Sequence, residues 1–420
     1  MVVNQSTGWG NKDKGTSGAL FFFYNLYLID FFFHLTSRIP ILGKIRLTAL
    51  LFLITWILAL VDKQKIACKP TNQITSAMNA LLVYLAATLL LTEYAGSVIR
   101  GNLLPFMKAI SFFYFTVFCV DTLPRFKKVL ALFIGLQLFR VLEPLYLNIT
   151  QGYWGSMTYL GGEYANRLSG APHDIINSNE LGFVIATIFP FLYFMHFMGK
   201  TFIKKCIVLV LLSLLGYAMI LTMSRGAFLA LCVGLLFLFK NAKNKTLLIV
   251  LGIVGVFAAL SVMTDIQRER YLSIFGASKS EGSNRSADGR IKGMLYEFEL
   301  GLTTRPIIGN GIGTTGETKF HDSGKYQPSH NFYAELLIEI GIIGAIFFFR
   351  FIKRIYFALQ RLRRTSDDGY LKNVVASLHV IFFMYAVYSL NYYGLSQSYW
   401  YFFGGLVVAL ELISNQEKKT

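Results

Sequence analysis

Long apolar runs constrain this chain more than any other feature of its sequence. Three clear examples cover residues 45–61, 206–221 and 247–263. A hydrocarbon core about 30 Å thick requires roughly 20 apolar residues in one helix, and these runs come close to that length. Because 54% of the residues are hydrophobic and only 15% are charged, a soluble globular fold is excluded. The sequence therefore predicts an all-α polytopic membrane protein.

Basic residues indicate which loops face the cytoplasm. Lysines and arginines gather in short loops at 200–205, 240–245 and 350–364, and such loops stay on the cytoplasmic side. Alternation from the loop at 350–372 places both termini in the cytoplasm. The loop that holds Arg38, Lys44 and Arg46 then falls on the outer face, against the same rule. About twelve transmembrane helices are predicted, near 18–36, 45–61, 76–98, 104–121, 128–149, 180–199, 206–222, 226–240, 246–264, 331–350, 373–390 and 396–414.

Two outer loops are longer than a simple connection, at about 150–179 and 265–329. The second contains about 65 residues, rich in Gly, Ser and Thr with balanced charge. Loops of this length are usually functional. We therefore expect a single integral membrane domain over residues 1–420, with its polar chemistry on the outer face.

Several functional classes are excluded. The net charge of +17 comes from basic residues dispersed at helix ends, so no nucleic-acid partner is expected. The four cysteines form no CxxC pair, and neither HExxH nor Asp-x-Asp occurs, so no metal site is expected. Residues 311–316 match GxGxxG but lack the strand, turn and helix of a nucleotide site. The sequence predicts neither a nucleotide nor any other cofactor.

His330 is the best placed of the six histidines. It precedes a predicted span on the outer face, between the polar residues Ser329 and Asn331. An imidazole with an unperturbed pKa near 6.5 can take up a proton at neutral pH. The structural alternative is a histidine that only caps the helix at 331–350.

Two arginines stand out for different reasons. Arg225 lies where two apolar runs meet with almost no loop, and an arginine at membrane depth is costly and usually functional. Its alternative role is a side chain that snorkels to the interface. Arg290 is one of nine basic residues in its loop, so its alternative role is a solvated charge. Arginine pairs suit a diphosphate because the guanidinium binds phosphate oxygens in pairs.

The order of these residues resembles the O-antigen ligase and polymerase family of bacterial envelopes, over about residues 222–345. The most specific part is His330-Asn331, followed after nine residues by Gly341 and after two more by Gly344. The other matching segments are Ser224-Arg225-Gly226, Gly289-Arg290 and Arg305-Pro306-Ile307-Ile308-Gly309-Asn310-Gly311-Ile312-Gly313, with Arg167-Leu168-Ser169-Gly170 and Asn177-Ser178-Asn179 similar to a first-loop segment of that family.

This resemblance implies a glycosyltransferase of the bacterial inner membrane, with its active site on the periplasmic face. The donor would be a glycan linked to undecaprenyl diphosphate, and transfer would be inverting and independent of metal. His330 would be catalytic, and Arg225 and Arg290 would bind the diphosphate. The remaining substrate contacts are expected from Asn331, Arg167 and Arg305.

Three functions stay open. An O-antigen ligase would transfer polysaccharide to a lipid A core sugar, and the His330-Asn331-x9-Gly-x2-Gly spacing favours it. A polymerase would join lipid-linked repeat units, and Arg290 followed by Gly301 favours that. A lipid-linked glycan transporter would use ionisable residues near the membrane midplane, and the candidates for that role are Asp30, Glu93, Arg140 and Glu143.

Overall fold

The computed structural model describes residues 16–417 except 64–70, 157–165, 198–200, 242–244, 278–280, 366–367 and 393. The described residues form helices and no strand, which confirms the all-α polytopic prediction. A helix lies at each of the twelve predicted spans: α1 (Gly18–Phe33), α4 (Leu47–Val61), α6 (Gln73–Thr88), α8 (Leu103–Cys119), α9 (Leu123–Gln151), α10 (Ser178–Phe191), α11 (Phe202–Thr222), α12 (Arg225–Asn241), α13 (Lys245–Val262), α17 (Phe332–Thr365), α18 (Gly369–Tyr388) and α19 (Tyr399–Glu417).

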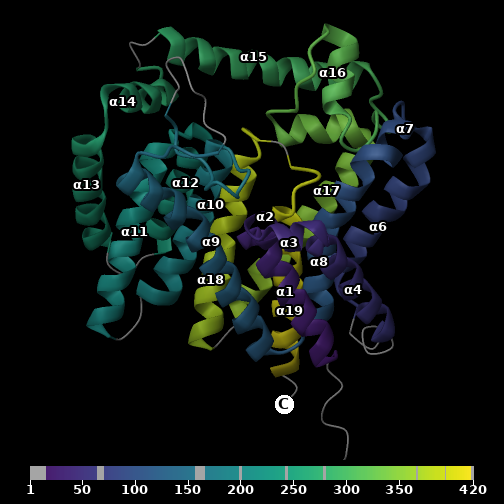
Figure 1. Ribbon diagram of the computed structural model, residues 1–420, viewed down its shortest axis with the longest axis horizontal. Helices are drawn as coiled ribbons and strands as arrows, with labels where there is room; N and C mark the ends of the chain where they lie inside the picture. Colours follow the sequence, from purple (N-terminus) through teal and green to yellow (C-terminus); the bar gives the residue numbers. More distant parts are fainter. Residues whose placement is uncertain are drawn as a thin grey trace, which may run out of the picture.

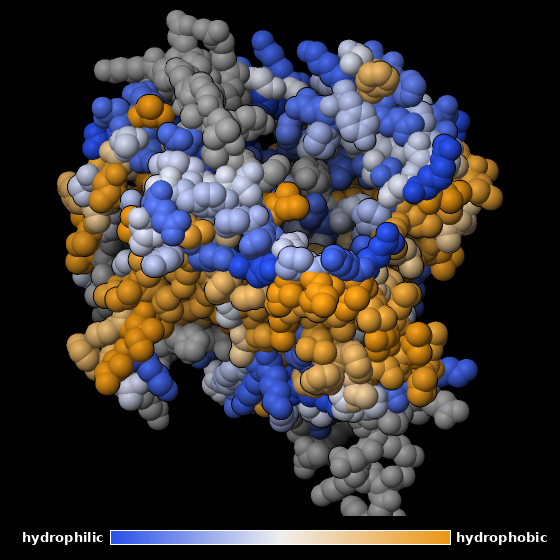
Figure 2. Space-filling view, viewed as in Figure 1, coloured by the Kyte–Doolittle hydropathy of each residue, from blue (hydrophilic) through white to orange (hydrophobic). Residues whose placement is uncertain are grey.

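Six helical stretches among the described residues are long and apolar enough to cross a membrane by length and composition. The total of twelve spans therefore stays a prediction. Figure 2 shows apolar residues gathered in a band across the molecule, with hydrophilic residues above and below it. Side chains such as Phe257 on α13 and Ile207 on α11 are more than half exposed. This apolar exposed surface is what lipid contact requires.

The large outer loop is mostly helical. Its three helices are α14 (Asp265–Leu272), α15 (Glu281–Thr303) and α16 (Thr315–Ser323). They lie together at one end of the helix bundle, and the C-terminus lies at the other end (Figure 1). α15 crosses the top of the bundle from the side of α14 to that of α16. The 265–329 region therefore forms a helical cap over the start of α17.

The basic first loop lies on the same side as residues 166–177. It forms the short helices α2 (Leu35–Arg38) and α3 (Pro40–Lys44). Arg38 Nη1 donates to Glu143 Oε1 at 2.7 Å near the end of α9, and His34 Nε2 lies 3.0 Å from Asp174 Oδ1. Glu143 pairs with Arg38, and the place of this loop on the outer face stays a prediction.

α17 extends further than the predicted span at 331–350 and reaches Thr365. Much of the predicted cytoplasmic loop at 350–372 is therefore helix. Within α17, Gly341 has φ 66° and breaks the regular helix. Such a break leaves backbone groups that need new partners.

Residues 305–313 supply those partners. Ile342 N donates to Pro306 O at 2.7 Å, and Gly311 N donates to Glu339 O at 2.9 Å. The backbones approach so closely that a side chain at Gly309 would meet the Glu339 backbone at 2.4 Å. Backbone packing thus explains the glycine-rich segment, and it anchors the cap to α17.

Candidate active site

The turn between α11 and α12 is buried and tight. α11 ends at Thr222, Met223 takes the left-handed conformation with φ 49°, and Ser224 Oγ accepts from Ala227 N at 3.4 Å. Arg225 is the first residue of α12, and its Nη1 donates to Ser273 Oγ at 2.9 Å. A helix N-terminus already favours an anion, so Arg225 adds a guanidinium where an anion is preferred.

Two further arginines meet this turn. Arg167 Nε donates to Thr222 O at 2.9 Å, and its Nη2 donates to Asn179 Oδ1 at 2.8 Å. Arg270 of α14 donates from Nε to Met223 O at 2.9 Å. Both arginine side chains are buried. The turn thus collects guanidinium groups from three separate segments of the chain.

Arg290 of α15 lies close to the same group. Burial first, and then the charges of Arg270, Arg290 and Arg225, lower the pKa of Arg167 to about 9. Burial also lowers the pKa of Arg290, while Tyr388 raises it. Mutual repulsion of this kind requires the four charges to be near one another. We call Arg167, Arg225, Arg270 and Arg290 the arginine cluster.

A cavity of about 520 Å³ lies next to the cluster, between α15, α16 and the segment that precedes α17. Its wall includes Arg290, Glu297, Lys319, Gln327 and His330. Arg290 therefore belongs both to the arginine cluster and to the wall of the cavity.

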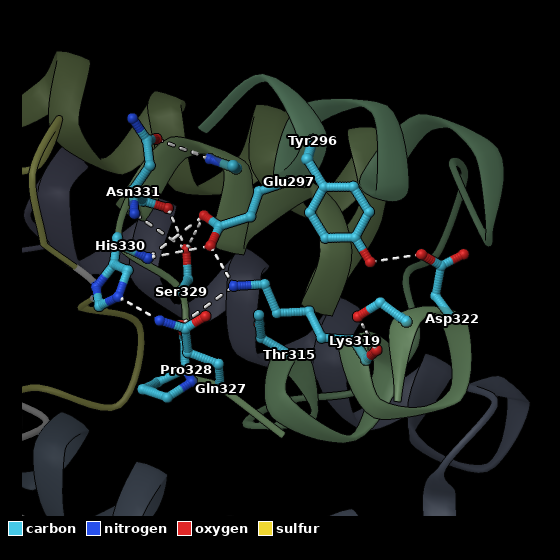
Figure 3. Close-up of polar contacts among 12 residues, drawn as sticks. Tyr296, Glu297, Thr315, Lys319, Asp322, Gln327, Pro328, Ser329, His330 and Asn331 are labelled. Carbon is cyan, nitrogen blue, oxygen red and sulfur yellow. Dashed lines mark hydrogen bonds and ion pairs between the residues drawn. The ribbon is translucent and has the colours of Figure 1, made fainter. Parts of the chain in front are cut away.

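His330 is held by its backbone, and its ring lines the cavity (Figure 3). His330 N lies 3.3 Å from both carboxylate oxygens of Glu297, and Ser329 Oγ donates to Glu297 Oε2 at 2.6 Å. The imidazole Nε2 lies 2.9 Å from Gln327 Nε2. Because an amide nitrogen can only donate, the imidazole Nε2 accepts in this amide orientation.

The surroundings of this imidazole favour its neutral form. Burial lowers the pKa of His330, Glu297 raises it, and Arg290 and Lys319 lower it. A neutral imidazole with an acceptor nitrogen can take up a proton. The structure thus supplies a proton acceptor beside a cluster of cations.

Asn331, and not His330, caps α17. Asn331 Oδ1 accepts from Tyr333 N at 2.9 Å and from Ala334 N at 3.0 Å, and its Nδ2 donates to Leu390 O at 3.0 Å. The oxygen and the nitrogen of the Asn331 amide therefore both bind backbone groups of the protein, whereas the sequence predicted that Asn331 contacts the substrate. The alternative role of His330 as the helix cap is excluded.

Arg305 does not join the arginine cluster. It follows the C-terminal end of α15, where its Nη2 lies 2.7 Å from Glu93 Oε2 and its Nη1 donates to Leu91 O at 2.7 Å. These contacts tie the cap to the segment after α6. The structure brings together Arg167, Arg225, Arg290 and His330 and leaves Arg305 outside.

Sequence reasoning missed Glu297 and Arg270. A signal for Glu297 was present, because Arg290, Gly293 and Glu297 are three and four residues apart and share one face of a helix. No comparable signal separates Arg270 from the other basic residues of its loop. Among the residues that the structure describes, no group of three or more His, Cys, Asp or Glu is arranged to hold a metal ion.

Residues 208–349 match a family model described as O-Antigen ligase. The matched region runs from α11 into α17 and contains Arg225, Arg270, Arg290, Glu297 and His330, while Arg167 precedes it. No curated protein matches the chain.

Proposed function

We propose that this protein is an O-antigen ligase. The proposal is supported by residues 208–349, whose match is to the O-antigen ligase and polymerase family. The protein transfers polysaccharide from undecaprenyl diphosphate to a lipid A core sugar. The reaction takes place on the periplasmic face of the bacterial inner membrane. The observation that carries this proposal is that Arg290, a member of the arginine cluster, and His330 line the same cavity.

The arginine cluster suits the donor diphosphate. Guanidinium groups bind phosphate oxygens in pairs and remain charged at neutral pH. The start of α12 adds backbone amides and a positive helix end. Negative charge grows on the leaving oxygen as the sugar–phosphate bond breaks, and preorganised cations there stabilise the transition state. The apolar band around the helices suits the polyprenyl tail.

His330 suits the acceptor side of the reaction. The acceptor hydroxyl takes the place of the Gln327 amide at the imidazole Nε2 and attacks the anomeric carbon of the donor. A new carbon–oxygen bond forms, the bond to the diphosphate breaks, and its electron pair leaves with the phosphate oxygen. The hydroxyl proton passes to His330. Direct displacement inverts the anomeric centre and needs no metal.

Gly301 also has a packing role, which is independent of the acceptor and leaves the choice between ligase and polymerase to experiment. A side chain at Gly301 would meet Leu337 Cβ at 2.9 Å, so a glycine is required where α15 crosses α17. Deleting the gene and running lipopolysaccharide on gels separates the two acceptors. Loss of all attached O-antigen supports the ligase, whereas lipopolysaccharide that carries single repeats supports a polymerase.

The residues on which a transporter would depend have partners in the fold. Arg140 lies 2.6 Å from Asp174, Arg38 pairs with Glu143, and Glu93 pairs with Arg305. Asp30 accepts from Thr36 Oγ1 at 2.7 Å. These contacts explain the four residues without a transport pathway.

The proposed function is tested with purified protein in detergent, supplied with lipid-linked donor and lipid A core acceptor and no nucleotide. His330→Ala should lower the transfer rate by about 10²–10⁴-fold, the contribution typical of a general base. Its thermal stability should stay unchanged, because the ring contributes little packing. His321→Ala is the matched control, because His321 stacks on Tyr94. Full activity of His330→Ala would remove His330 from the mechanism.

A further inference from the structure

Glu297 occupies a central position between α15, α16 and the segment before α17. It is 1% exposed. Its carboxylate accepts from Lys319 Nζ at 2.5 Å, from Ser329 Oγ at 2.6 Å and from His330 N at 3.3 Å. One side chain thus gathers three donors from two other segments (Figure 3).

Helix capping does not account for this arrangement, because Asn331 already caps α17. A buried carboxylate is costly unless it is paired and hydrogen-bonded. An apolar residue at position 297 would pack α15 against α16 at lower cost. The ionised carboxylate therefore suggests a task beyond packing.

We propose that Glu297 is the positioning residue of His330, because its carboxylate fixes the Ser329-His330 backbone from which the imidazole extends into the cavity wall. This inference rests on the proposed function. Lys319 pairs with the carboxylate and keeps it in place while the imidazole is neutral.

The charges around His330 come from each element that packs against it. On α15, Glu297 raises the pKa of His330 and Arg290 lowers it, and on α16 Lys319 lowers it. Lys325 and Tyr296 line the same cavity. Glu297 is the group that favours the protonated ring, so its charge offsets part of the effect of the two cations.

The test is Glu297→Gln, which keeps the shape of the side chain and an acceptor oxygen but removes the charge. The variant should lower the pKa of His330, so modification of the ring by diethylpyrocarbonate should persist to a lower pH. Mass spectrometry of the peptide that contains His330 measures this midpoint without any substrate. The kcat for transfer should fall by about tenfold, with the KM for the donor unchanged.

Asp322→Asn is the matched control, because it removes a nearby carboxylate that accepts from Tyr296 OH at 2.5 Å instead. This variant should leave the midpoint and the kcat unchanged. An unshifted midpoint in Glu297→Gln, with an active wild type, would overturn the inference. An inactive wild type with a shifted midpoint would instead contradict the proposed function.

Ser329→Ala covers the case in which Glu297→Gln does not fold. It removes the hydroxyl that donates to Glu297 and accepts from Asn331 N, and it leaves the carboxylate. The kcat should fall severalfold while the midpoint of His330 stays in place. Unchanged kcat in Ser329→Ala would overturn the positioning role.

Discussion

Two groups of arginines lie on the outer side of this protein, and they differ in what they contact. Arg38 and Arg140 contact the carboxylates of Glu143 and Asp174. Arg167, Arg225 and Arg270 contact carbonyl, amide and hydroxyl oxygens. The second group is distinguished by crowding, because guanidinium groups from separate segments of the chain meet at one turn.

The paired group is structural, and the arginine cluster is the group that we propose binds the donor diphosphate. The paired group joins α9 to the outer loops. The guanidinium groups of the arginine cluster are also oriented by hydrogen bonds, but they lie close to one another. Burial and the charges of the other members lower the pKa of Arg167. Crowded cations become favourable when an anion binds among them. Substitutions in the two groups should therefore affect different measurements.

The largest effect is expected from Arg140→Met, and it should be on stability. The variant leaves Asp174, which is 2% exposed, without its main cation. Removing one partner of a buried ion pair costs about 3–5 kcal/mol. Thermal unfolding in detergent measures this loss, and the transfer rate per folded molecule should stay near that of the wild type.

Acid titration gives an independent check of the paired group. Burial raises the pKa of Asp174, but Arg140 and His34 outweigh this effect and hold it at about 2. A carboxyl with a depressed pKa stabilises the fold above about pH 4 and loses that contribution as the pH falls toward 2. Arg140→Met should lose most of this dependence. A stable but inactive Arg140→Met would contradict the structural role of the arginines that pair with carboxylates.

Arg225→Lys should have the next largest effect, and it should be on activity. Lysine keeps the charge but cannot form two parallel hydrogen bonds to a phosphate. Loss of one preorganised donor at a developing oxyanion costs about 10²–10³-fold in rate. Steady-state transfer assays measure this loss, with Arg268→Lys as the control because Arg268 is 42% exposed and pairs with Asp265. Normal donor affinity and rate in Arg225→Lys would remove it from the diphosphate site.

Arg305→Met should have the smallest effect. Its ion pair with Glu93 is 40% and 48% exposed, and exposed pairs contribute about 0–1 kcal/mol. The transfer rate should stay within about twofold of the wild type. A large loss of activity without loss of stability would return Arg305 to the substrate contacts.

The helices could be predicted because lipid imposes a length on every apolar run. Arg225 and His330 could be proposed because each is unusual for its place in the sequence, whereas Arg290, one of nine basic residues in its loop, was proposed from the family resemblance. Asn331 shows a limit of that reasoning. Asparagine before a helix is a favoured N-cap, and this local preference already indicated a structural role.

The positions of Glu297 and Arg305 depend on long-range contacts that the sequence does not reveal. Glu297 acts through Ser329 and His330, more than 30 residues away. The ion pair of Arg305 with Glu93 joins segments more than 200 residues apart. The break at Gly341, which fixes the cap to α17, likewise depends on backbone hydrogen bonds to residues 306–311.

α15 carries Arg290 and Glu297 on one rigid helix. Glu297 lies seven positions after Arg290, which corresponds to about 10 Å along the helix axis. In the proposed reaction, this spacing sets how far a diphosphate bound at Arg290 lies from His330, which Glu297 positions. One inserted residue between them would turn Glu297 by about 100° around the axis. Arg290 and Glu297 could then no longer serve the proposed diphosphate site and His330 at the same time.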